Sequence, residues 1–269
     1  MKKYCIIFIS LLLFSCASIV STKNDPVIIP EAMEMQFGLS ARQEFEKQYK
    51  KSTNTEVANY VSKIGNKLVA SLPEKYKGTK FEFILLDSSE VNAFAIPGGY
   101  VYITTGLMKE LQDEAQLATV LGHEMGHVLK KHTVKALQRQ IIASKGVEFL
   151  DNLINSGKPE DQKNEMLSLG SSIGVSLLLL KNSRENEFEA DEMGSLIASY
   201  AGYSPNGTIE VQNIFLKLRQ NKPGMVEQML STHPVSEERI KHAEDFITQN
   251  SLTGSITNMD NYVKIKKKI

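Results

Sequence analysis

The sequence predicts an α+β fold that is mostly helical and carries one small β-sheet. Apolar residues recur at helical spacing in most segments after residue 31, whereas three short runs between residues 80 and 104 alternate or are bounded by turn residues, as strands do. The chain has 269 residues, of which 42% are hydrophobic and 23% charged, and this fits one globular domain with small additions. Net charge is zero and no basic stripe occurs, so nucleic acid is not an expected partner.

The first fifteen residues have the layout of a targeting segment. A positively charged start precedes an apolar run at residues 6–14, which is too short to span a bilayer. The run ends at Leu13-Phe14-Ser15-Cys16, which resembles the lipobox of bacterial lipoproteins, although Phe14 is bulkier than the residue usual there. We therefore expect residues 1–15 to be a lipoprotein signal peptide. An ordinary secretory signal is the alternative.

The lipobox resemblance implies that Cys16 is lipidated on its thiol and its new amino group. Residues 16–30 would then be a tether from the lipid to the domain. Because Cys5 leaves with the signal peptide, the mature chain would have no free thiol and no disulfide. Ala17 is not the aspartate that retains lipoproteins at the inner membrane of some bacteria, so the outer membrane is favoured over the inner one.

Two helices are expected before the strands. Residues 31–51 predict a helix with a polar second half. Residues 53–72 predict another, in which Thr53 and Glu56 make a capping box and apolar residues then recur at helical spacing up to Pro73. This repeat indicates one buried face.

Three strands are expected next, at residues 80–86, 91–96 and 100–104. In the first of them alternate residues are apolar, so one face should be buried. The second and third are joined by Pro97-Gly98-Gly99, a sequence typical of a turn.

Helices follow after the strands. Asp113 is expected to cap a helix at residues 117–131, with Gln116 in the reciprocal position. The later helices are expected at residues 176–180, 184–201, 209–218 and 235–248.

These elements place one domain at residues 31–250 and a C-terminal tail at 251–269. The tail ends in four closely spaced lysines, Lys264, Lys266, Lys267 and Lys268. Such a run predicts a solvated segment, and contact with anionic lipid is the alternative.

The run His123-Glu124-Met125-Gly126-His127 reads H-E-x-x-H within the helix at 117–131. Positions four apart on a helix point the same way, so His123 and His127 can hold one zinc ion while Glu124 reaches a water at that ion. Glu124 also falls near the centre of the apolar stripe, where a carboxylate is costly unless a metal site compensates. A chance match, expected in roughly one random chain per hundred of this composition, is the alternative.

A catalytic zinc usually has three protein ligands and one open position. Glu187 is the expected third ligand. Asp191 lies four residues later on the same helical face and is expected to accept a hydrogen bond from the non-ligating nitrogen of His123. Glu189 and Glu192 point elsewhere and are expected to be solvated. An exposed acidic helix without metal is the alternative.

Several motifs follow one another over roughly residues 55–245. They are Asn92-Ala93-Phe94-Ala95-Ile96-Pro97-Gly98-Gly99-Tyr100-Val101-Tyr102, Gly106-Leu107-Met108, the H-E-x-x-H run, Ser183-Arg184-Glu185-Asn186-Glu187-Phe188-Glu189-Ala190-Asp191, Thr232-His233-Pro234 and Arg239-Ile240. Together they resemble the zinc metallopeptidases (gluzincins) grouped with HtpX, BepA and the CAAX prenyl endopeptidases. The chain lacks the multiple spanning helices of HtpX and the CAAX enzymes and has no room for the helical repeat domain of BepA, so it resembles the small periplasmic lipoprotein branch.

The resemblance implies a zincin-like metalloprotease domain with its small sheet beside the H-E-x-x-H helix. It implies one Zn²⁺ per chain on His123, His127 and Glu187, with Glu124 as the general base. It also implies that Gly98, Gly99 and Tyr100 lie on a strand along the cleft, where they would bind an extended peptide. A plain hairpin turn is the alternative. Asn92 is expected to hold the backbone or leaving amine of the substrate.

His233 is placed beside the zinc by the same resemblance. It is expected either to stabilise the oxyanion or to occupy the open zinc position in a resting state, and a structural histidine is the alternative. His132 is expected to point away from the metal face and to be a packing or surface residue. His242 has no expected partner.

The expected function is that of a zinc-dependent endopeptidase of the bacterial cell envelope, on the periplasmic side. Its substrates would be misfolded or unassembled envelope proteins, as the resemblance implies. The alternative is a periplasmic chaperone or assembly factor that binds extended peptides with little or regulated proteolysis. A zinc hydrolase of non-peptide bonds fits less well because an edge strand suits peptides.

Overall fold

The structure is a computed structural model that describes residues 26–155, 160–161, 164–165, 167–169 and 181–269. The expected signal peptide, the lipidation site at Cys16 and the expected helix at 176–180 lie outside these residues. Within the described part of the chain, no helix combines the length and the apolar character that crossing a bilayer requires.

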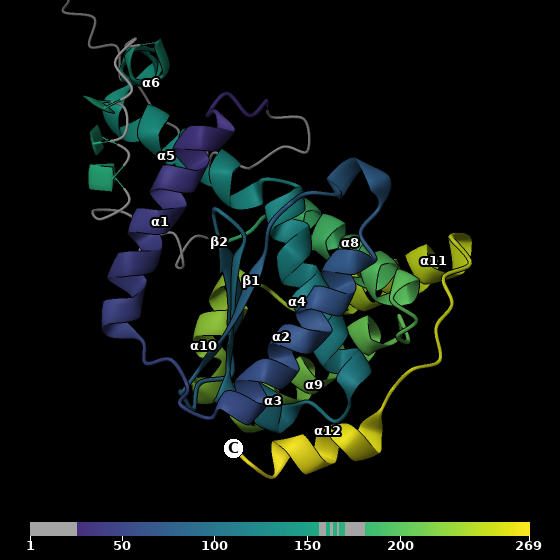
Figure 1. Cartoon of the computed structure of the whole chain (residues 1–269). Helices are drawn as coiled ribbons and strands as arrows, with labels where there is room; N and C mark the ends of the chain where they lie inside the picture. The colour runs from purple at the N-terminus through teal and green to yellow at the C-terminus, as the bar shows by residue number, and fades with distance from the viewer. Residues whose placement is uncertain (1–25, 156–159, 162–163, 166, 170–180) are drawn as a thin grey trace, which may run out of the picture.

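Helices dominate the described chain, and the prediction of a mostly helical α+β fold is confirmed (Figure 1). The helices are α1 (Glu31–Gln48), α2 (Thr55–Ala70), η1 (Glu74–Tyr76), α3 (Thr105–Glu110), α4 (Glu114–Leu129), α5 (His132–Lys145), α6 (Val147–Asn155), α8 (Arg184–Tyr200), α9 (Gly207–Asn221), α10 (Pro223–Thr232), α11 (Glu237–Gln249) and α12 (Met259–Lys266).

The described residues form one three-stranded sheet in the order β1-β3-β2. β1 (Glu82–Leu86) pairs in parallel with β3 (Tyr100–Thr104), and β2 (Ala93–Ile96) pairs antiparallel with β3. β3 is therefore the central strand, and β2 is an edge strand whose outer side is unpaired in this sheet.

The predicted turn between β2 and β3 is confirmed, and its glycines have a conformational cause. Gly98 and Gly99 have φ angles of 88° and 82°, which side chains disfavour. A Cβ on Gly99 would also lie 2.0 Å from the carbonyl oxygen of Lys80.

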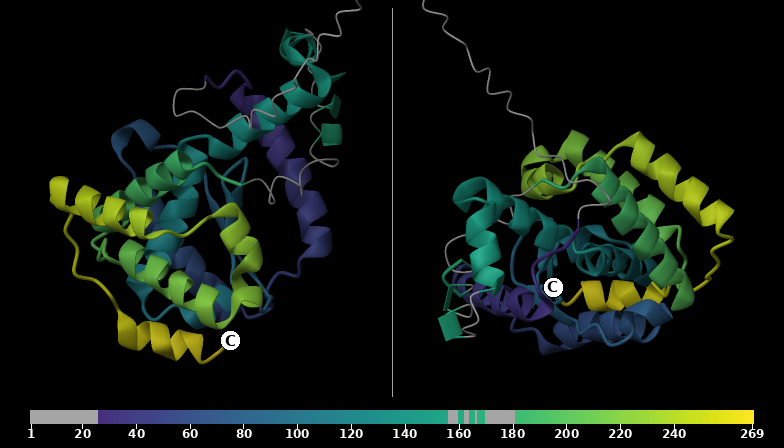
Figure 2. Two further views of the ribbon diagram at one scale, coloured as in Figure 1. Left: turned by 180° about the vertical axis from the view of Figure 1, so that it is seen from behind. Right: turned by 90° about the horizontal axis from the view of Figure 1, so that it is seen from above.

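The sheet separates two apolar clusters because side chains alternate across each strand. On one face α1 packs Phe45 against Phe94 and Tyr102, with ring centroids 4.8 and 4.9 Å apart. On the other face α2 and α4 cover the sheet and extend the larger cluster toward α8 and α9 (Figures 1 and 2). The helices that carry the predicted site thus lie in the larger cluster.

Two details of the helix ends differ from expectation. The cap of α2 is Asn54, whose Oδ1 accepts from the N–H of Val57 at 3.2 Å, so the predicted box of Thr53 and Glu56 is wrong. Both Asn and Thr cap helices well, and the sequence pattern did not decide between neighbours. The predicted cap of α4 is present, since Asp113 Oδ1 accepts from the N–H of Gln116 at 2.9 Å.

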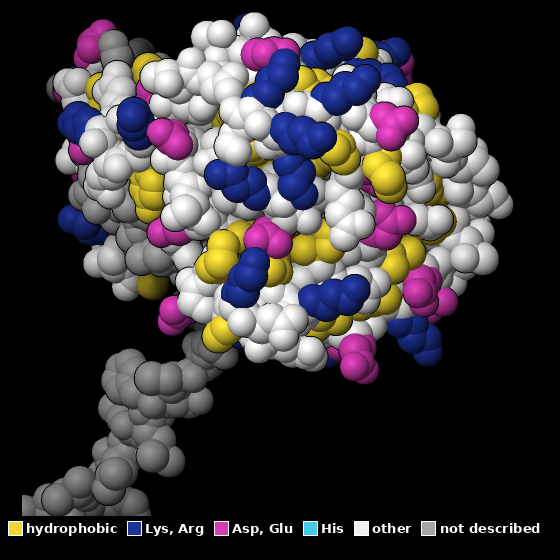
Figure 3. Space-filling view, turned by 90° about the horizontal axis from the view of Figure 1, so that it is seen from below, with side chains coloured by type: hydrophobic (Ala, Val, Ile, Leu, Met, Phe, Trp, Pro, Cys, Tyr) yellow, Lys and Arg dark blue, Asp and Glu magenta, His cyan; other side chains and the backbone are white. Residues whose placement is uncertain are grey.

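The C-terminal segment is a packed helix rather than the solvated tail that its lysines predict. Tyr262 of α12 is fully buried and donates its hydroxyl proton to the carbonyl oxygen of Met108 at 2.7 Å. Lys266 donates to the carbonyl oxygen of Leu111 at 2.7 Å. Tyr262 and Ile265 are three residues apart and form the buried stripe, while basic side chains gather on the surface of this end of the molecule (Figure 3).

Candidate metal centre

Helices α4 and α8 approach closely because glycines stand where they touch. A Cβ on Gly122 would lie 3.0 Å from the Cα of Gly194. A Cβ on Gly126, within the H-E-x-x-H run, would lie 3.0 Å from the Cα of Ala190. This close packing sets the histidines of α4 directly against Glu187 of α8.

Four ligand atoms converge between α4, α8 and the end of α10. His123, His127, Glu187 and His233 each offer one, and these atoms all lie within 4.8 Å of one another. The Nε2 atoms of His123 and His127 are 3.0 Å apart. Oε1 of Glu187 lies 3.4 Å from Nε2 of His127 and 3.0 Å from Nδ1 of His233.

The spacing and chemistry of these donors fit zinc. Donors at about 2.0–2.2 Å from one tetrahedral ion lie roughly 3.3–3.6 Å from each other. The pairs described here are separated by 3.0 to 3.6 Å. Imidazole nitrogen and carboxylate oxygen are both ordinary zinc ligands. His123, His127 and Glu187 are thus the residues that could hold the ion, with His233 beside them.

The charges around the site also suit a cation. Glu124, Glu187 and Asp191 are all buried and supply three formal negative charges, against the positive charges of Arg239 and His233. One negative charge remains, and a bound cation would compensate it. Unbalanced buried charge is costly, so the site has an electrostatic reason to take up metal.

Asp191 and Arg239 support the ligands from the α8 and α11 side. Asp191 Oδ1 lies 2.9 Å from Nδ1 of His123, so a proton on that nitrogen leaves Nε2 free to bind metal. Arg239 donates to both Asp191 oxygens at 2.8 Å and lies 2.6 Å from Oε2 of Glu187. Burial raises the pKa of Glu187, but the charges of Arg239 and His233 outweigh burial and hold this pKa well below its usual value.

The role of Arg239 is not evident from residue type or spacing. Its side chain is 3% exposed, although an arginine near the start of a polar helix is ordinarily solvated. In the sequence it stood out only as part of the Arg239-Ile240 motif.

His132 and Glu189 form a second support that the sequence analysis missed. Nδ1 of His132 lies 2.9 Å from Nδ1 of His127, and Nε2 of His132 lies 3.2 Å from Oε2 of Glu189. If His127 donates from Nδ1 to His132, and His132 donates from Nε2 to Glu189, then Nε2 of His127 stays free to bind metal. The expectation that His132 points away failed because α4 ends at Leu129 and Lys131 has a left-handed φ of 57°, which redirects the chain.

The two glutamates expected to be solvated are both partnered. Glu189 is buried against His132. Glu192 pairs with His242, whose Nε2 lies 2.9 Å from Oε1 of Glu192 and whose ring stacks on Phe188. The second pair is partly exposed and lies outside the ligand cluster.

His132→Phe is expected to weaken zinc binding by about 10- to 100-fold, because the ring volume is kept but the acceptor that orients His127 is lost. Competition with a fluorescent chelator measures this affinity. His242→Phe is the matched control: it removes the other histidine–carboxylate pair and should leave zinc affinity unchanged. Equal affinity of His132→Phe and wild type would contradict an orienting role.

Glu124 lies beside the ligand cluster but outside it. Its carboxylate is buried, burial raises its pKa, and its Oε1 lies 3.9 Å from Nε2 of His233. Burial alone would lower the pKa of His233, but the charges of Glu187 and Glu124 outweigh it and raise this pKa to about 9. Glu124 therefore lies beside the four ligand atoms with a titratable neighbour in His233.

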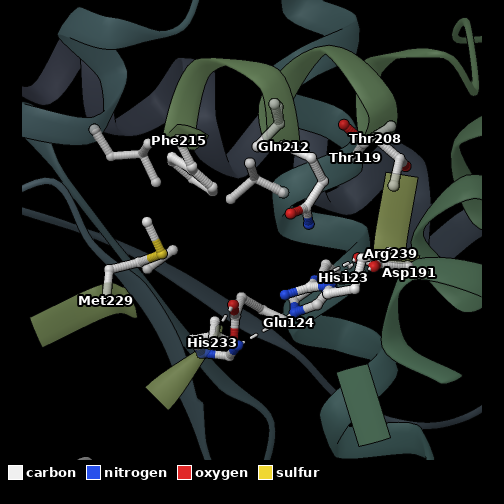
Figure 4. A pocket seen from close by; sticks show the side chains of 14 residues that line it. Thr119, His123, Glu124, Asp191, Thr208, Gln212, Phe215, Met229, His233 and Arg239 are labelled. Atoms are coloured by element: carbon white, nitrogen blue, oxygen red, sulfur yellow. Dashed lines mark hydrogen bonds and ion pairs between the residues drawn. The ribbon is translucent and has the colours of Figure 1, made fainter. Parts of the chain in front are cut away.

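Two hollows meet at Glu124 and His233. The α9 hollow is lined by α9, by Ala93 of β2 and by both of these residues (Figure 4). The strand hollow is lined by Phe94, Ala95 and Ile96 of β2 and by the same pair. The edge strand β2 therefore runs from one hollow to the other past the candidate site.

The residues expected to bind substrate lie elsewhere. Gly98 and Gly99 form the β2–β3 turn, and Tyr100 begins β3, whose backbone is paired on both sides. β1 covers the other edge of β3, so these residues offer no free strand edge in this sheet, and their part in substrate binding stays a prediction. Asn92 is buried and lines neither hollow.

Comparison with known proteins agrees with this geometry. The model of Peptidase family M48 matches residues 55–247. The beta-barrel assembly-enhancing protease of Yersinia pestis is 28% identical over 197 residues, which cover 72% of this chain and 39% of that protein. The mitochondrial metalloendopeptidase OMA1 of Arabidopsis thaliana is 30% identical over 165 residues, covering 61% of this chain and 31% of that protein.

A smaller relative is matched over more of its length. Metalloprotease YcaL of Escherichia coli is 29% identical over 198 residues, covering 72% of this chain and 74% of that protein. The chain spans less than half the length of the first two relatives. The match to the family model covers most of the chain, including α4, α8 and His233, and the predicted resemblance is confirmed. The chain belongs to peptidase family M48.

Proposed function

We propose that this protein is a zinc-dependent endopeptidase. One observation carries the proposal: four ligand atoms converge, three of them from His123, His127 and Glu187, and the separate carboxylate of Glu124 lies beside them where two hollows meet. A purely structural zinc site requires neither an adjoining hollow nor an acid beside its ligands. The family to which the chain belongs supports the same activity.

Each residue has a distinct part in the proposed hydrolysis. Zinc held by His123, His127 and Glu187 would supply Lewis-acid polarisation of the scissile carbonyl and a lowered pKa for the attacking water. Glu124 takes the proton from that water and later gives it to the leaving amine. Its pKa is raised by burial, which brings it nearer to neutrality and suits both steps. Asp191 and His132 hold the two imidazoles in the tautomer that leaves Nε2 free.

The backbone of β2 provides a place for the substrate. Residues 93–96 form an edge strand that passes both hollows, so an extended peptide could pair with it and present a bond to Glu124. Asn92, next to this strand, stays a candidate for holding the substrate backbone. This role is an indirect one because the side chain is buried.

The proposed setting is the bacterial cell envelope, with misfolded or unassembled proteins as substrates. Support comes from the relatives called beta-barrel assembly-enhancing protease and from the lipobox-like sequence at Cys16. Lipid on Cys16 would hold the domain at a membrane surface on the periplasmic side, with the outer membrane favoured.

Metal removal tests the activity. The zinc-loaded protein should cleave casein, the protein stripped with a chelator should not, and restoring one equivalent of zinc should restore cleavage. Fluorescence release from labelled casein, with metal content measured on the same samples, checks this. Full activity in the stripped protein would rule out a zinc mechanism.

The second candidate is a chaperone or assembly factor with little or regulated proteolysis. It is favoured by one observation: Nδ1 of His233 lies 3.3 Å from Nε2 of His123 and could occupy the position that a catalytic ion keeps open. A His233→Ala arm in the casein assay separates the two. Cleavage gained by the variant supports a regulated protease, whereas two inert zinc-bound proteins support the binding function.

A further inference from the structure

The α9 hollow has an apolar group of residues in its wall, beside the polar and charged residues of the candidate site. Val120 of α4, Val211 and Phe215 of α9, and Met229 of α10 line it (Figure 4). Such a lining favours a large apolar side chain, since burial removes its surface from water.

Gln212 is a polar residue within the apolar part of this wall. It is 4% exposed, its side chain points into the hollow in Figure 4, and its Oε1 has no hydrogen-bond partner among the described residues. The two threonines of the same wall are satisfied: Thr119 donates to the carbonyl oxygen of Gln116 at 3.0 Å, and Thr208 bonds Ser195 at 2.9 Å. A buried acceptor without a partner is unfavourable, so a hydrogen-bond donor that enters the hollow would be stabilised by Oε1 of Gln212.

The position of the hollow links it to the reaction. Glu124 and His233 line its inner end, and Ala93 of the edge strand lines its side. A peptide paired with β2 and presenting a bond to Glu124 would therefore direct a neighbouring side chain into this hollow, and the next side chains along would reach the strand hollow.

From these observations we propose that the α9 hollow is a specificity pocket for tyrosine adjacent to the scissile bond, with Gln212 as the selecting residue. This inference rests on the proposed peptidase function. The aromatic ring suits the apolar wall, and the phenolic hydroxyl bonds the amide of Gln212. A hydroxyl both donates and accepts, so it satisfies this amide in either orientation. Phenylalanine fills the same space but leaves the acceptor unpaired.

The expected preference is modest because one neutral hydrogen bond is gained. Peptides that differ only in Tyr, Phe or Leu, placed on either side of one bond, are the probes. The zinc-loaded wild type should cleave the Tyr peptide with a kcat/KM about three- to tenfold above that of the Phe peptide, for one of the two placements. Gln212→Leu should lose this ratio or reverse it.

Gln140→Leu is the matched control. Gln140 is on α5, its Oε1 is also buried without a partner among the described residues, and it lines neither hollow. Its variant should keep the wild-type ratio. If Gln212→Leu does not fold, the wild-type ratio still decides, as does Phe215→Ala, which enlarges the hollow and should weaken discrimination between Tyr and Leu.

The outcomes separate the two levels of the proposal. Cleavage with equal kcat/KM for the Tyr and Phe peptides overturns the specificity pocket and leaves the peptidase intact. If Gln212→Leu keeps the wild-type ratio of kcat/KM for the Tyr and Phe peptides, the role of Gln212 as the selecting residue is overturned and the peptidase function is unaffected. Failure of the zinc-loaded protein to cleave casein or any peptide overturns the proposed function, and this inference with it.

Discussion

Glu124→Gln should abolish casein cleavage, with a loss of about 10²- to 10⁴-fold or more, while one zinc per chain is retained. Glutamine keeps the shape of the side chain but cannot take a proton. Because Glu124 lies outside the ligand cluster, its replacement leaves His123, His127 and Glu187 in place. Metal analysis and casein turnover on the same preparation measure both parts of the expectation.

A matched glutamate on α8 provides the control. Glu192 pairs with His242 away from the ligand cluster, so Glu192→Gln should retain both zinc and activity. The thermal midpoint of Glu124→Gln should not fall. Burial disfavours the charged form of the Glu124 carboxyl group and raises its pKa, and the substitution removes that charge. A fully active, zinc-bound Glu124→Gln protein would falsify the assignment of the base.

The sequence predicted those relations that lie within one helix. His123 and His127 share a face, as do Glu187 and Asp191, because four residues make about one helical turn. The same reasoning failed at His132, three residues beyond the end of α4. His132 was placed by continuing the rotation of α4, but the left-handed Lys131 turns the chain, and His132 comes back against His127.

Relations between elements were harder to predict. The turn residues predicted that β2 and β3 are neighbours, but not that β1 adds in parallel on the far side of β3. That pairing makes β3 the central strand and leaves β2 at an edge of the sheet. The predicted substrate contacts of Gly98, Gly99 and Tyr100 do not take this pairing into account and stay a prediction. Long-range pairing leaves no local periodic signal, whereas a hairpin does.

Burial of charge was also not predictable from composition. Arg239 and Glu189 both belong to strongly polar stretches, which ordinarily indicate a solvated face. Each is buried because a partner on another helix or turn meets it: Asp191 and Glu187 for Arg239, and His132 for Glu189. The partners become visible only when α8, α11 and the turn after α4 are placed together.

Arg239→Met should destabilise the metal-free protein by about 3–5 kcal/mol. Arg239 is 3% exposed and is the guanidinium that meets both Glu187 and Asp191. Methionine fills much of the space, but the two carboxylates remain buried without this cation, and breaking a buried pair has a cost of this size. Bound zinc restores some positive charge, so the deficit should be smaller in the loaded protein. Urea unfolding with and without zinc measures it.

A lower pH should also reduce the loss of unfolding free energy caused by Arg239→Met. Burial raises the pKa of Asp191, but Arg239 and His123 outweigh burial and lower it below its usual value, so the stability that this pairing contributes is present above the unfolded pKa and is lost as the pH falls. The difference between wild type and Arg239→Met should therefore shrink through the acidic range. A difference independent of pH would indicate lost packing instead of lost charge.

The same two helices supply the control for Arg239→Met. Arg184 of α8 pairs with Glu238 of α11 at 3.0 Å, with both side chains more than half exposed. Arg184→Met should cost about 0–1 kcal/mol, because water screens an exposed pair. Equal losses in the two variants would mean that the buried guanidinium contributes no more than a surface ion pair. The argument that buried charge at this site favours a bound cation would then be wrong.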